Sequence, residues 1–419
     1  MNKKQIVILG SGFAGLKLAR ELSGHPGYSI TLIDKNNYHQ FQPFLYQVAT
    51  ANLDASNISF PLRNIFKKCK NVSVRITEVT HIDVLNDKVD TPIGPIYYDF
   101  LVLATGAVTN YFGNAELARM TFPMKSTWEA LILRNTLIQH FEDAVASTMH
   151  QINKNLSIVI VGGGPTGVEL SGAIAEMKRD ALPLEYPELD FSKMEVYLIE
   201  GTNRLLAAMS NSSSQIAKHY LEEMGVVVKT NTLVKDYNGI TLKMQDGTEI
   251  ESSIVIWAAG VKGNIPSGIN TLWCSASSQI RVDEFNRVSA KDHVFAIGDI
   301  SIMLSELYPR GFPQLASVAM DQAKNLAINF KRMALNKSML PFHYYNKGSM
   351  ATVGRNKAVV DLAYPKWSFH GFIAWIIWMT LHLFLLISFK NRLIVFINWI
   401  YKYFTLSQSL SLLFNKLKQ

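Results

Sequence analysis

The stretch IVILGSGFAG, residues 6–15, decides how the fold begins. Its four apolar residues predict a buried strand, and Gly10, Gly12 and Gly15 have the GxGxxG spacing of a turn that binds phosphate at the start of a helix. Without side chains the turn can tighten, a pyrophosphate can approach the backbone, and the helix can pack on the strand. The unpaired N–H groups of the first helical turn then attract the anion. The sequence therefore predicts a dinucleotide-binding unit at its start.

The strand that follows this helix ends in an acidic residue. The segment SITLIDK, residues 29–35, carries Asp34 nineteen residues after Gly15. A carboxylate at that place accepts hydrogen bonds from a ribose hydroxyl. A lone GxGxxG is often an ordinary glycine turn, but a strand, a helix and an acid in the right order favour a bound dinucleotide.

The same pattern recurs in the middle of the chain. An apolar strand, LSIVIV, leads into Gly162, Gly164 and Gly167 of GGGPTG, and a helix is expected over residues 168–182. The second strand of this unit, MEVYLIE, ends at Glu200. Two such units imply two dinucleotides, one a fixed flavin and the other a diffusible nicotinamide, between which a hydride can pass.

The acid of the second unit lies farther along the chain than that of the first. Glu200 follows Gly167 by thirty-three residues, because residues 182–193 look like a loop inserted before the strand. A carboxylate there repels a 2′-phosphate, so the unit is expected to prefer NADH over NADPH. The nearby Arg204 leaves that preference open.

The composition excludes several classes of protein. With 419 residues, 48% of them hydrophobic, the chain is long enough for two or three domains with full cores, which excludes a disordered or fibrous protein. The two cysteines, Cys69 and Cys274, are too far apart in sequence for a CxxC pair or a thiolate cluster, so no metal site is predicted. The first strand begins without a preceding signal-like segment, so the folded domains are expected to face the cytoplasm.

The C-terminal tail has its own pattern of charge and hydropathy. From Leu362 onward there is no Asp or Glu, whereas six Lys and Arg residues carry most of the formal charge of +8. These basic residues alternate with long apolar runs. The pattern favours an anionic lipid surface, and not nucleic acid, as the partner.

The tail also contains nineteen consecutive residues without charge, 371–389, which is long enough for a transmembrane helix. Basic residues flank this run on both sides, so charge asymmetry gives no orientation. Trp375, Trp378 and His382 fall on one helical face and give it polar ring edges. Such a face is more typical of a helix at a membrane surface than of one that crosses it.

A second apolar stripe follows near the C-terminus. Leu406, Leu410, Leu413 and Leu417 recur at helical spacing with serines opposite. We therefore expect a monotopic attachment, with helices that lie in the membrane interface. A single transmembrane span at 371–389 and a homodimer contact through the apolar face are the alternatives.

Several longer segments resemble those of a known family. They are NNYHQFQPFLYQVAT (36–50), PQLASVAMDQAKNLA (313–327), KGSMATVGRNKAVVDL (347–362) and SFHGFIAWIIWMTLH (368–382). Within the two-dinucleotide flavoprotein superfamily, they are similar to the type II NADH dehydrogenases, which are single-subunit NADH:quinone oxidoreductases that do not pump protons. The resemblance covers almost the whole chain, and its last two segments are the most specific.

This resemblance implies an α/β fold with two Rossmann-like FAD/NAD(P)-binding domains and a C-terminal amphipathic helical membrane-binding domain. The NADH domain is expected to be inserted in the FAD domain. The implied division is 1–113 for the first part of the FAD-binding domain, 114–150 for a helical connection, 151–265 for the NADH-binding domain, 266–340 for the second part of the FAD-binding domain, and 341–419 for the membrane-anchoring domain. Hydride would pass from NADH to tightly bound FAD, and two electrons and two protons would then reach a membrane quinone.

The resemblance also assigns residues to the two cofactors. Those for FAD are the first glycine turn, its acid and three later motifs, namely Gly10, Gly12, Phe13, Ala14, Gly15, Asp34, Lys35, Ala104, Thr105, Gly106, Gly298, Asp299 and Ala316. Those for NADH are Gly162, Gly164, Thr166, Gly167, Glu200, Ala259 and Gly260. Four residues of the segment 36–50 are expected to wall the flavin, namely His39, Phe41, Pro43 and Tyr46.

The remaining assignments concern proton transfer and quinone. Glu169, just inside the helix after the second glycine turn, matches a residue that the family uses in NADH and quinone chemistry, as a relay of protons. The other interpretation is a helix N-terminal acid that favours the macrodipole. Quinone contacts are expected at Gln42, Ser317 and Gln322. The chain departs from the family pattern at Ser317 and Asp321, where the family has glutamine.

Two other functions remain open at this point. The glycine motifs also fit an NADH-responsive flavoprotein of the apoptosis-inducing-factor type, which has a binding or signalling role and needs no amphipathic tail. Reduction of a protein partner such as a ferredoxin would require a binding patch that the sequence does not localise. Disulfide reductases are excluded because residues 42–47 contain no redox cysteine pair.

Overall fold

The computed structural model describes residues 3–148, 155–288, 291–405 and 412–413. They form two compact units, each built from three separate stretches of the chain. The first unit comprises Met1–Gln40, Phe60–Val108 and Val261–Tyr345. The second comprises Phe41–Ser59, Thr109–Gly260 and Asn346–Gln419. The five-part division expected from the sequence stays a prediction.

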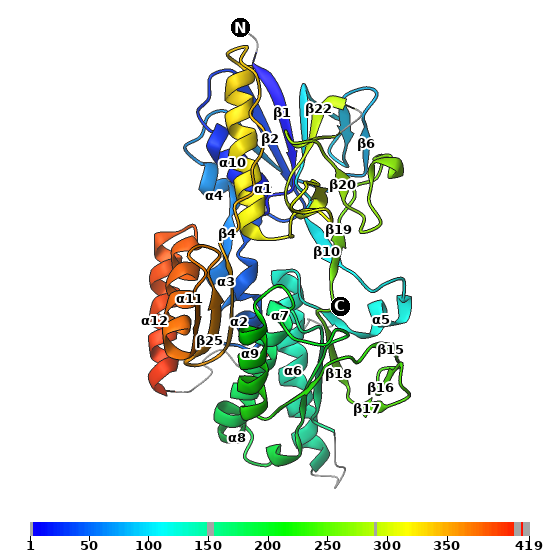
Figure 1. The fold of residues 1–419 in the computed structure, drawn as a ribbon, viewed down its shortest axis with the longest axis vertical. Helices are drawn as coiled ribbons and strands as arrows, with labels where there is room; N and C mark the ends of the chain where they lie inside the picture. The colour runs from blue at the N-terminus through cyan, green and yellow to red at the C-terminus, as the bar shows by residue number, and fades with distance from the viewer. Residues whose placement is uncertain (1–2, 149–154, 289–290, 406–411, 414–419) are drawn as a thin grey trace. The chain divides into compact units, whose positions relative to one another are not determined.

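The first unit is centred on a six-stranded sheet. β1 (Lys4–Leu9) lies between the parallel strands β2 (Tyr28–Asp34) and β9 (Phe100–Leu103). The outer strands are β5 (Val72–Ile76), β22 (Lys291–Ala296) and the antiparallel edge strand β21 (Arg287–Val288). The last four residues of β1 are at most 1% exposed, which explains their unbroken apolar sequence. Two helices pack side by side against one face of this sheet, α1 (Phe13–Leu22) and α10 (Ala316–Met333) (Figure 1).

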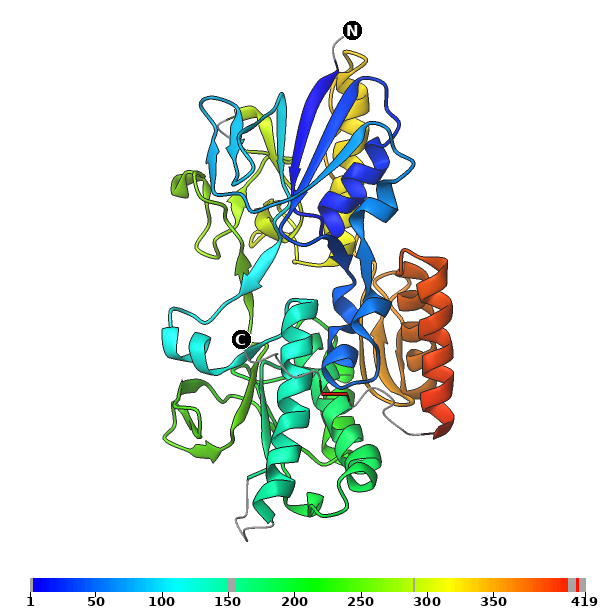
Figure 2. The ribbon, with the colours of Figure 1, turned by 180° about the vertical axis from the view of Figure 1, so that it is seen from behind.

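The second unit contains a five-stranded parallel sheet. Its strands, in spatial order, are β11 (Phe122–Pro123), β18 (Ile254–Trp257), β12 (Ile158–Val161), β13 (Val196–Ile199) and β14 (Val226–Lys229). The helices around it are α6 (Thr127–Thr148), α7 (Pro165–Glu176) and α9 (Asn211–Glu223) (Figure 2). In sequence, all of these strands come between β9 and β22 of the first sheet. The predicted insertion of one Rossmann-like domain in the other is therefore confirmed.

The predicted loop before β13 consists largely of short helical turns. α7 continues into a π-helical turn, η2 (Met177–Ala181), which is followed by α8 (Leu182–Glu185) and the 3-10 turn η3 (Phe191–Lys193). Asp190 caps the last of these by accepting the N–H of Ser192 at 3.1 Å. These turns lengthen the path to Glu200, which still follows β13 directly.

The remaining elements are short connections and small sheets. Before the second parallel sheet they are β3 (Tyr38–Gln40), η1 (Gln42–Phe44), α2 (Leu45–Ala49), α3 (Ala55–Ile58), β4 (Ser59–Pro61), α4 (Leu62–Phe66), β6 (His81–Asp83), β7 (Lys88–Asp90), β8 (Ile96–Tyr97), β10 (Ala107–Thr109) and α5 (Ala115–Met120). Those that follow are β15 (Val234–Tyr237), β16 (Thr241–Met244), β17 (Glu249–Glu251), β19 (Val261–Gly263), η4 (Thr271–Trp273), β20 (Ile280–Arg281), η5 (Gly298–Ile300) and β23 (Ser301–Ile302).

The C-terminal part of the second unit begins with a sheet that the sequence analysis did not predict. Three antiparallel strands, β24 (Ser349–Gly354), β25 (Lys357–Asp361) and β26 (Ser368–His370), precede the helices α11 (Gly371–Leu385) and α12 (Phe389–Thr405). The two helices lie side by side in both views (Figures 1 and 2). The strand β24 packs directly on α7, where a Cβ on Gly172 would lie 1.5 Å from the carbonyl oxygen of Val353.

The charge-free run 371–389 is divided between α11 and α12, with a break after Leu385. No helix in the described part of the chain is long and apolar enough to cross a membrane. The face of α11 with polar ring edges turns toward the protein, because Trp378 is only 2% exposed and stacks on His382 with ring centroids 4.2 Å apart. Of the predicted leucine stripe, Leu406, Leu410 and Leu417 lie outside the described residues.

The contact at Gly172 predicts a sharp effect on stability. Gly172→Ala adds a methyl group against a backbone carbonyl, so it should lower the free energy of unfolding by about 2 kcal/mol or more despite the better helix propensity of alanine. Gly164→Ala at the start of the same helix is the control, because a Cβ there meets no atom within 4 Å. Urea denaturation of both variants checks this, and equal stabilities would contradict the packing described.

Candidate functional site

Both glycine turns have the geometry that the GxGxxG pattern predicts. A Cβ on Gly15 would lie 1.9 Å from the carbonyl oxygen of Gly10, and a Cβ on Gly167 would lie 1.8 Å from that of Gly162. Each turn therefore depends on glycine for the close approach of helix and loop. The nearly equal distances mean that the two units build the same cradle from separate stretches of sequence.

The helices that follow these turns begin without a side-chain cap. Gly12 precedes α1 and Gly164 precedes α7, and a glycine has no side chain with which to cap the helix. By contrast, Asn114 caps α5 and Ser210 caps α9. Two uncapped helix starts beside glycine turns fit the pyrophosphate groups of FAD and NADH. Thr166 is exposed in the first turn of α7, as a phosphate contact requires.

The two strand-end acids occupy equivalent places. Asp34 Oδ2 accepts the backbone N–H of Ser11 at 2.7 Å, and Glu200 Oε2 accepts that of Gly163 at 2.6 Å. A second oxygen of Glu200 accepts the N–H of Thr202 at 2.7 Å. Each carboxylate is thus held beside its glycine turn, where a ribose would lie.

Arg204 does not extend toward the carboxylate of Glu200. Its guanidinium donates to the carbonyl of Ala207 at 2.7 Å and makes a short hydrogen bond to Asn211 Oδ1. A guanidinium engaged in this way is directed at its own loop. The arrangement leaves the charge of Glu200 uncompensated by Arg204, so the expected preference for NADH over its 2′-phosphate form stays a prediction.

The later motifs of the first unit surround η5 and the start of α10. Thr105 Oγ1 donates to the carbonyl of Asn264 at 2.7 Å, next to the buried Ala104 and to Gly106. The carbonyl of Asp299 accepts the side-chain amides of Gln279 and Gln314 at 3.1 and 2.9 Å.

These bonds fix the backbone on both sides of the expected flavin contacts. Two further residues complete the assigned set: Ala316 is the first residue of α10 and Lys35 is exposed after β2. In the second unit, Ala259 and Gly260 follow β18 and are partly exposed.

The three residues expected to contact quinone lie in different settings. Gln322 is 2% exposed and accepts the N–H of Gly298 at 2.7 Å, so its amide supports the flavin-side backbone. Ser317 is half-buried in the first turn of α10. Gln42 belongs to the second unit, where its amide donates to the carbonyl of Lys125 at 3.2 Å. Their contact with quinone stays a prediction.

The candidate proton donor lies in a cavity within the second unit. The cavity is walled by α2, α7, β24, α11 and α12, and with the space at its mouth it has a volume of about 840 Å³. Glu169 lines it, is 8% exposed, and accepts the N–H of Thr352 at 3.4 Å. Burial raises the pKa of Glu169 to about 8, against the weaker lowering effects of this N–H and of the Trp378 side chain. The carboxyl is therefore protonated at neutral pH and poised to release a proton.

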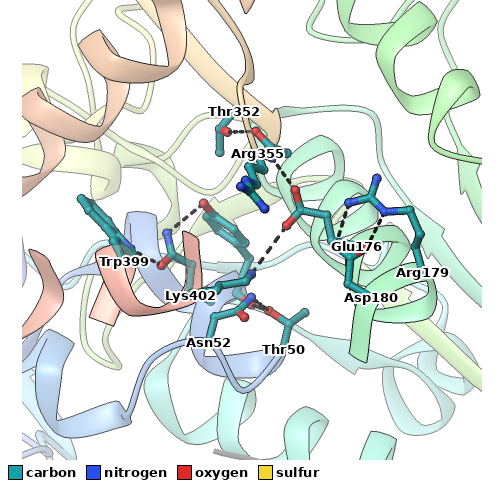
Figure 3. A network of polar contacts seen from close by, with 12 residues as sticks. Thr50, Asn52, Glu176, Arg179, Asp180, Thr352, Arg355, Trp399 and Lys402 are labelled. Atoms are coloured by element: carbon teal, nitrogen blue, oxygen red, sulfur yellow. Dashed lines mark hydrogen bonds and ion pairs between the residues drawn. The ribbon is translucent and has the colours of Figure 1, made fainter. Parts of the chain in front are cut away.

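Charged residues surround the same cavity (Figure 3). Glu176 accepts a short hydrogen bond from the backbone N–H of Arg355 and lies 3.5 Å from Lys402 Nζ. The guanidinium of Arg355 lies 4.0 Å from the ring centre of Tyr403, as a cation–π contact. These contacts join α7, the turn after β24 and α12. The sequence analysis missed them, although Glu176 lies seven residues after Glu169 and so shares its helix face.

Aromatic and amide groups form the opposite wall. Trp399 Nε1 donates to Gln47 Oε1 at 2.8 Å, and Gln47 Nε2 donates to the hydroxyl of Tyr46 at 2.9 Å. Tyr46 was expected beside the flavin, and the structure places it on the wall of the Glu169 cavity. Because Gln47 and Trp399 are more than 350 positions apart, only the fold brings them together.

Two known protein families match the chain, one over its larger N-terminal part and one over its C-terminal part. Residues 4–323 match the pyridine nucleotide-disulphide oxidoreductase family, and residues 346–406 match the NDH2 C-terminal domain. The second match coincides with the sheet β24–β25–β26 and the two helices that follow it.

Individual relatives agree with these matches. The chain is 36% identical to the type II NADH:quinone oxidoreductase NdhA of Mycobacterium tuberculosis over 95% of this chain and 86% of that protein. It is 28% identical to the type II NADH:quinone oxidoreductase of Haemophilus influenzae over 86% of this chain and 87% of the relative. The structure of NDH2 from Plasmodium falciparum in complex with NADH has the same fold, with a TM-score of 0.86, 22% identity and coverage of 96% of this chain and 99% of that one. These matches give no support to a signalling flavoprotein.

The position of Glu200 predicts how the enzyme discriminates between nicotinamides. Glu200→Gln keeps an oxygen for the Gly163 N–H but removes the charge that repels a 2′-phosphate, so KM for NADPH should fall about tenfold while KM for NADH stays within about threefold. Glu195→Gln, at the exposed start of the same strand, should change neither value. Steady-state kinetics with both nucleotides checks this, and an unchanged KM for NADPH would argue against the role of Glu200.

Proposed function

Because the chain belongs to the type II NADH:quinone oxidoreductase family, we propose that its first glycine turn holds FAD, its second holds NADH, and its Glu169 cavity receives the quinone. The chain is an FAD-dependent NADH dehydrogenase with quinone as its acceptor. The single observation that carries the assignment of the cavity is a buried, protonated carboxyl in a space lined by aromatic rings.

The overall reaction consumes one proton. NADH, a proton and quinone give NAD⁺ and quinol; FAD, when bound, would accept the hydride and pass on its two electrons and its proton, so that one further proton completes the quinol. The uncapped start of α7 binds the pyrophosphate of NADH, and Glu200 orients its ribose. The corresponding groups at α1 and Asp34 hold FAD.

Glu169 supplies the proton that the quinone oxygen takes up. Its pKa of about 8 keeps the carboxyl protonated near neutral pH, and the low polarity around it makes the neutral form the stable one. As negative charge develops on the quinone oxygen, the carboxyl donates its proton and becomes a carboxylate. Solvent then returns a proton through the open mouth of the cavity before the next turnover.

We propose further that α11 and α12 rest on the surface of the membrane. Large apolar side chains are exposed along both helices, including Phe372 at 54%, Phe384 at 66%, Phe389 at 78%, Phe396 at 47% and Phe404 at 79%. On α12 the exposed Leu393 and Ile400 lie between the phenylalanines, so that exposed apolar residues recur every three or four positions and make one continuous stripe. An exposed apolar patch of this kind is typical of a surface that contacts protein or lipid.

Charge favours lipid as the partner of this apolar surface. The chain contains no acidic residue after Leu362, and Lys390 and Arg392 lie at the start of α12. Basic residues beside exposed aromatic rings suit an anionic headgroup layer. Because NADH is made in the cytoplasm and quinone is dissolved in the bilayer, attachment to the cytoplasmic face of the membrane gives the enzyme access to both.

The role of Glu169 predicts a selective loss of quinone reduction. Glu169→Gln keeps the shape of the side chain and removes the proton donor, so quinone turnover should fall about 100-fold, while reduction of FAD by NADH in stopped flow stays unchanged. In the unaltered enzyme, quinone turnover should decline above pH 8, because the donor loses its proton there. The variant should lack this decline. Full quinone turnover in the variant would exclude Glu169 as the donor.

The apolar surface predicts binding to lipid vesicles. A double variant, Phe384→Glu with Phe396→Glu, should bind phosphatidylglycerol-containing vesicles at least about tenfold more weakly, because each buried phenyl group contributes about 2 kcal/mol. Leu307→Glu is the control, since this side chain is 87% exposed in the first unit. Vesicle sedimentation measures both.

The same variants distinguish a homodimer contact from a lipid contact. If the double variant binds vesicles as the native chain does but changes from dimer to monomer in analytical ultracentrifugation, the apolar surface joins two copies of the chain. That outcome would overturn the membrane proposal. Loss of vesicle binding without a change in mass supports it.

A further inference from the structure

The hydrogen bonds on the wall of the Glu169 cavity have a fixed direction. The indole N–H of Trp399 can only donate, so the atom of Gln47 that it meets at 2.8 Å must be the amide oxygen. The amide nitrogen of Gln47 therefore faces the hydroxyl of Tyr46, 2.9 Å away, and donates to it. Tyr46 uses a lone pair in this bond. Its own proton must point elsewhere.

The remaining direction for that proton is the cavity. Tyr46 is 8% exposed and lines the cavity together with Glu169. Burial, and next the charge of Glu169, raise the pKa of Tyr46 well above its usual value, so its hydroxyl keeps its proton at every physiological pH. The phenol is thus a permanent donor that faces a carboxyl.

A second donor faces the same space. Trp378 is 2% exposed and lines the cavity, and its Nε1–H meets no hydrogen-bond acceptor among the described residues. It acts on the carboxyl of Glu169 as a hydrogen-bond donor that lowers the pKa of this group. Because that contact lies outside hydrogen-bond geometry, the buried N–H can still donate to an oxygen that binds in the cavity.

We propose that Tyr46 and Trp378 donate two hydrogen bonds to an acceptor oxygen that binds beside Glu169, and that Trp399 and Gln47 are positioning residues that aim the Tyr46 proton at it. This inference rests on the proposed function, because the oxygen is a quinone carbonyl or a water that relays the proton to it. Two donors match the lone pairs of a carbonyl oxygen, and Glu169 supplies the proton as that oxygen gains electrons. Trp399 lies on α12, so the helix proposed to rest on lipid also orients the donor.

Charged and titratable groups from several elements face this position. They are Glu169, Glu176 and Asp180 from α7 and its continuation, Arg355 from the turn after β24, and Lys402 and Tyr403 from α12. Glu176 is compensated by Lys402 and by the Arg355 backbone, and Asp180 by Arg179 at 2.6 Å. Burial lowers the pKa of His382 to about 4, so this neighbour of Trp378 stays neutral. Glu169 is therefore the group whose change of protonation state affects the hydrogen bonds of Tyr46 and Trp378.

The first test replaces Trp399, whose N–H fixes the orientation of the Gln47 amide and thereby the direction of the Gln47–Tyr46 hydrogen bond. Trp399→Phe removes the indole N–H, so the Gln47 amide can turn and accept the Tyr46 proton. Quinone turnover should fall about tenfold, the value of one hydrogen bond, and the pH at which turnover is half-maximal should shift. Flavin reduction by NADH should be unchanged. A purely structural role would lower stability without moving that pH.

Trp367→Phe is the matched control, because it replaces the same residue type in the same C-terminal segment. Trp367 is 60% exposed and does not line the cavity. Should Trp399→Phe fail to fold, Tyr46→Phe removes the hydroxyl alone and should give the same tenfold loss. Both variants are made in the full-length holoenzyme and assayed with a short-chain ubiquinone analogue.

The second test identifies the acceptor. Trp378→Phe should raise KM for quinone about tenfold if the indole bonds to the quinone carbonyl, and should lower kcat at unchanged KM if it bonds to a relaying water. Wild-type KM, kcat and pH profile in Trp399→Phe, Tyr46→Phe and Trp378→Phe would overturn the inference. If Glu169→Gln nonetheless abolishes quinone turnover, the proposed function stands without it. If Glu169→Gln is also fully active, the proposed function fails as well.

Discussion

The close packing of α7 against β24 is the constraint on which the rest of the site depends. Because Gly172 has no side chain, the backbone of Val353 reaches the helix, and the strand covers the turn of α7 that carries Glu169. This cover removes the carboxyl from water, and desolvation is the largest cause of its raised pKa. Without the C-terminal segment, Glu169 would be an ordinary acid near a helix start. The segment that bears the proposed lipid surface therefore also buries the proposed proton donor.

One helix carries both proposed substrate sites, at different parts of its length. The start of α7 presents uncapped N–H groups and Gly167 to a dinucleotide, whereas Glu169, Gly172 and Glu176 recur three and four residues apart on one face. That face meets β24 at its centre, and at its end Glu176 contacts both Lys402 and the backbone of Arg355. The helix therefore connects the proposed nicotinamide cradle to the cavity. A shift of α7 along its axis would disturb both at once.

The sequence predicted the parts of the site that local chemistry defines. Glycine spacing, strand-end acids and the repeat of the whole unit all follow from contacts within about forty residues, so Asp34 and Glu200 were placed correctly beside their turns. The wall of the cavity could not be predicted in the same way, because Gln47 meets Trp399 and Glu176 meets Lys402 only after the chain has folded back. The sheet β24–β25–β26 could not be predicted from alternation, because β24 and β25 each bury three consecutive residues and so lack the period of two of a half-buried strand.

The hydropathy of α11 and α12 is ambiguous for a physical reason. Each helix has two apolar faces, one of aromatic rings packed on the protein and one of phenylalanine and aliphatic side chains open to the surroundings. The inward face carries indole and imidazole groups, whose N–H atoms can reach partners inside the protein, as those of Trp399 and His382 do. The outward face carries mainly phenylalanine, leucine and isoleucine side chains. The charge-free run 371–389 therefore results from two short helices that pack on the protein with one face and expose apolar side chains on the other, which is the face proposed to meet lipid.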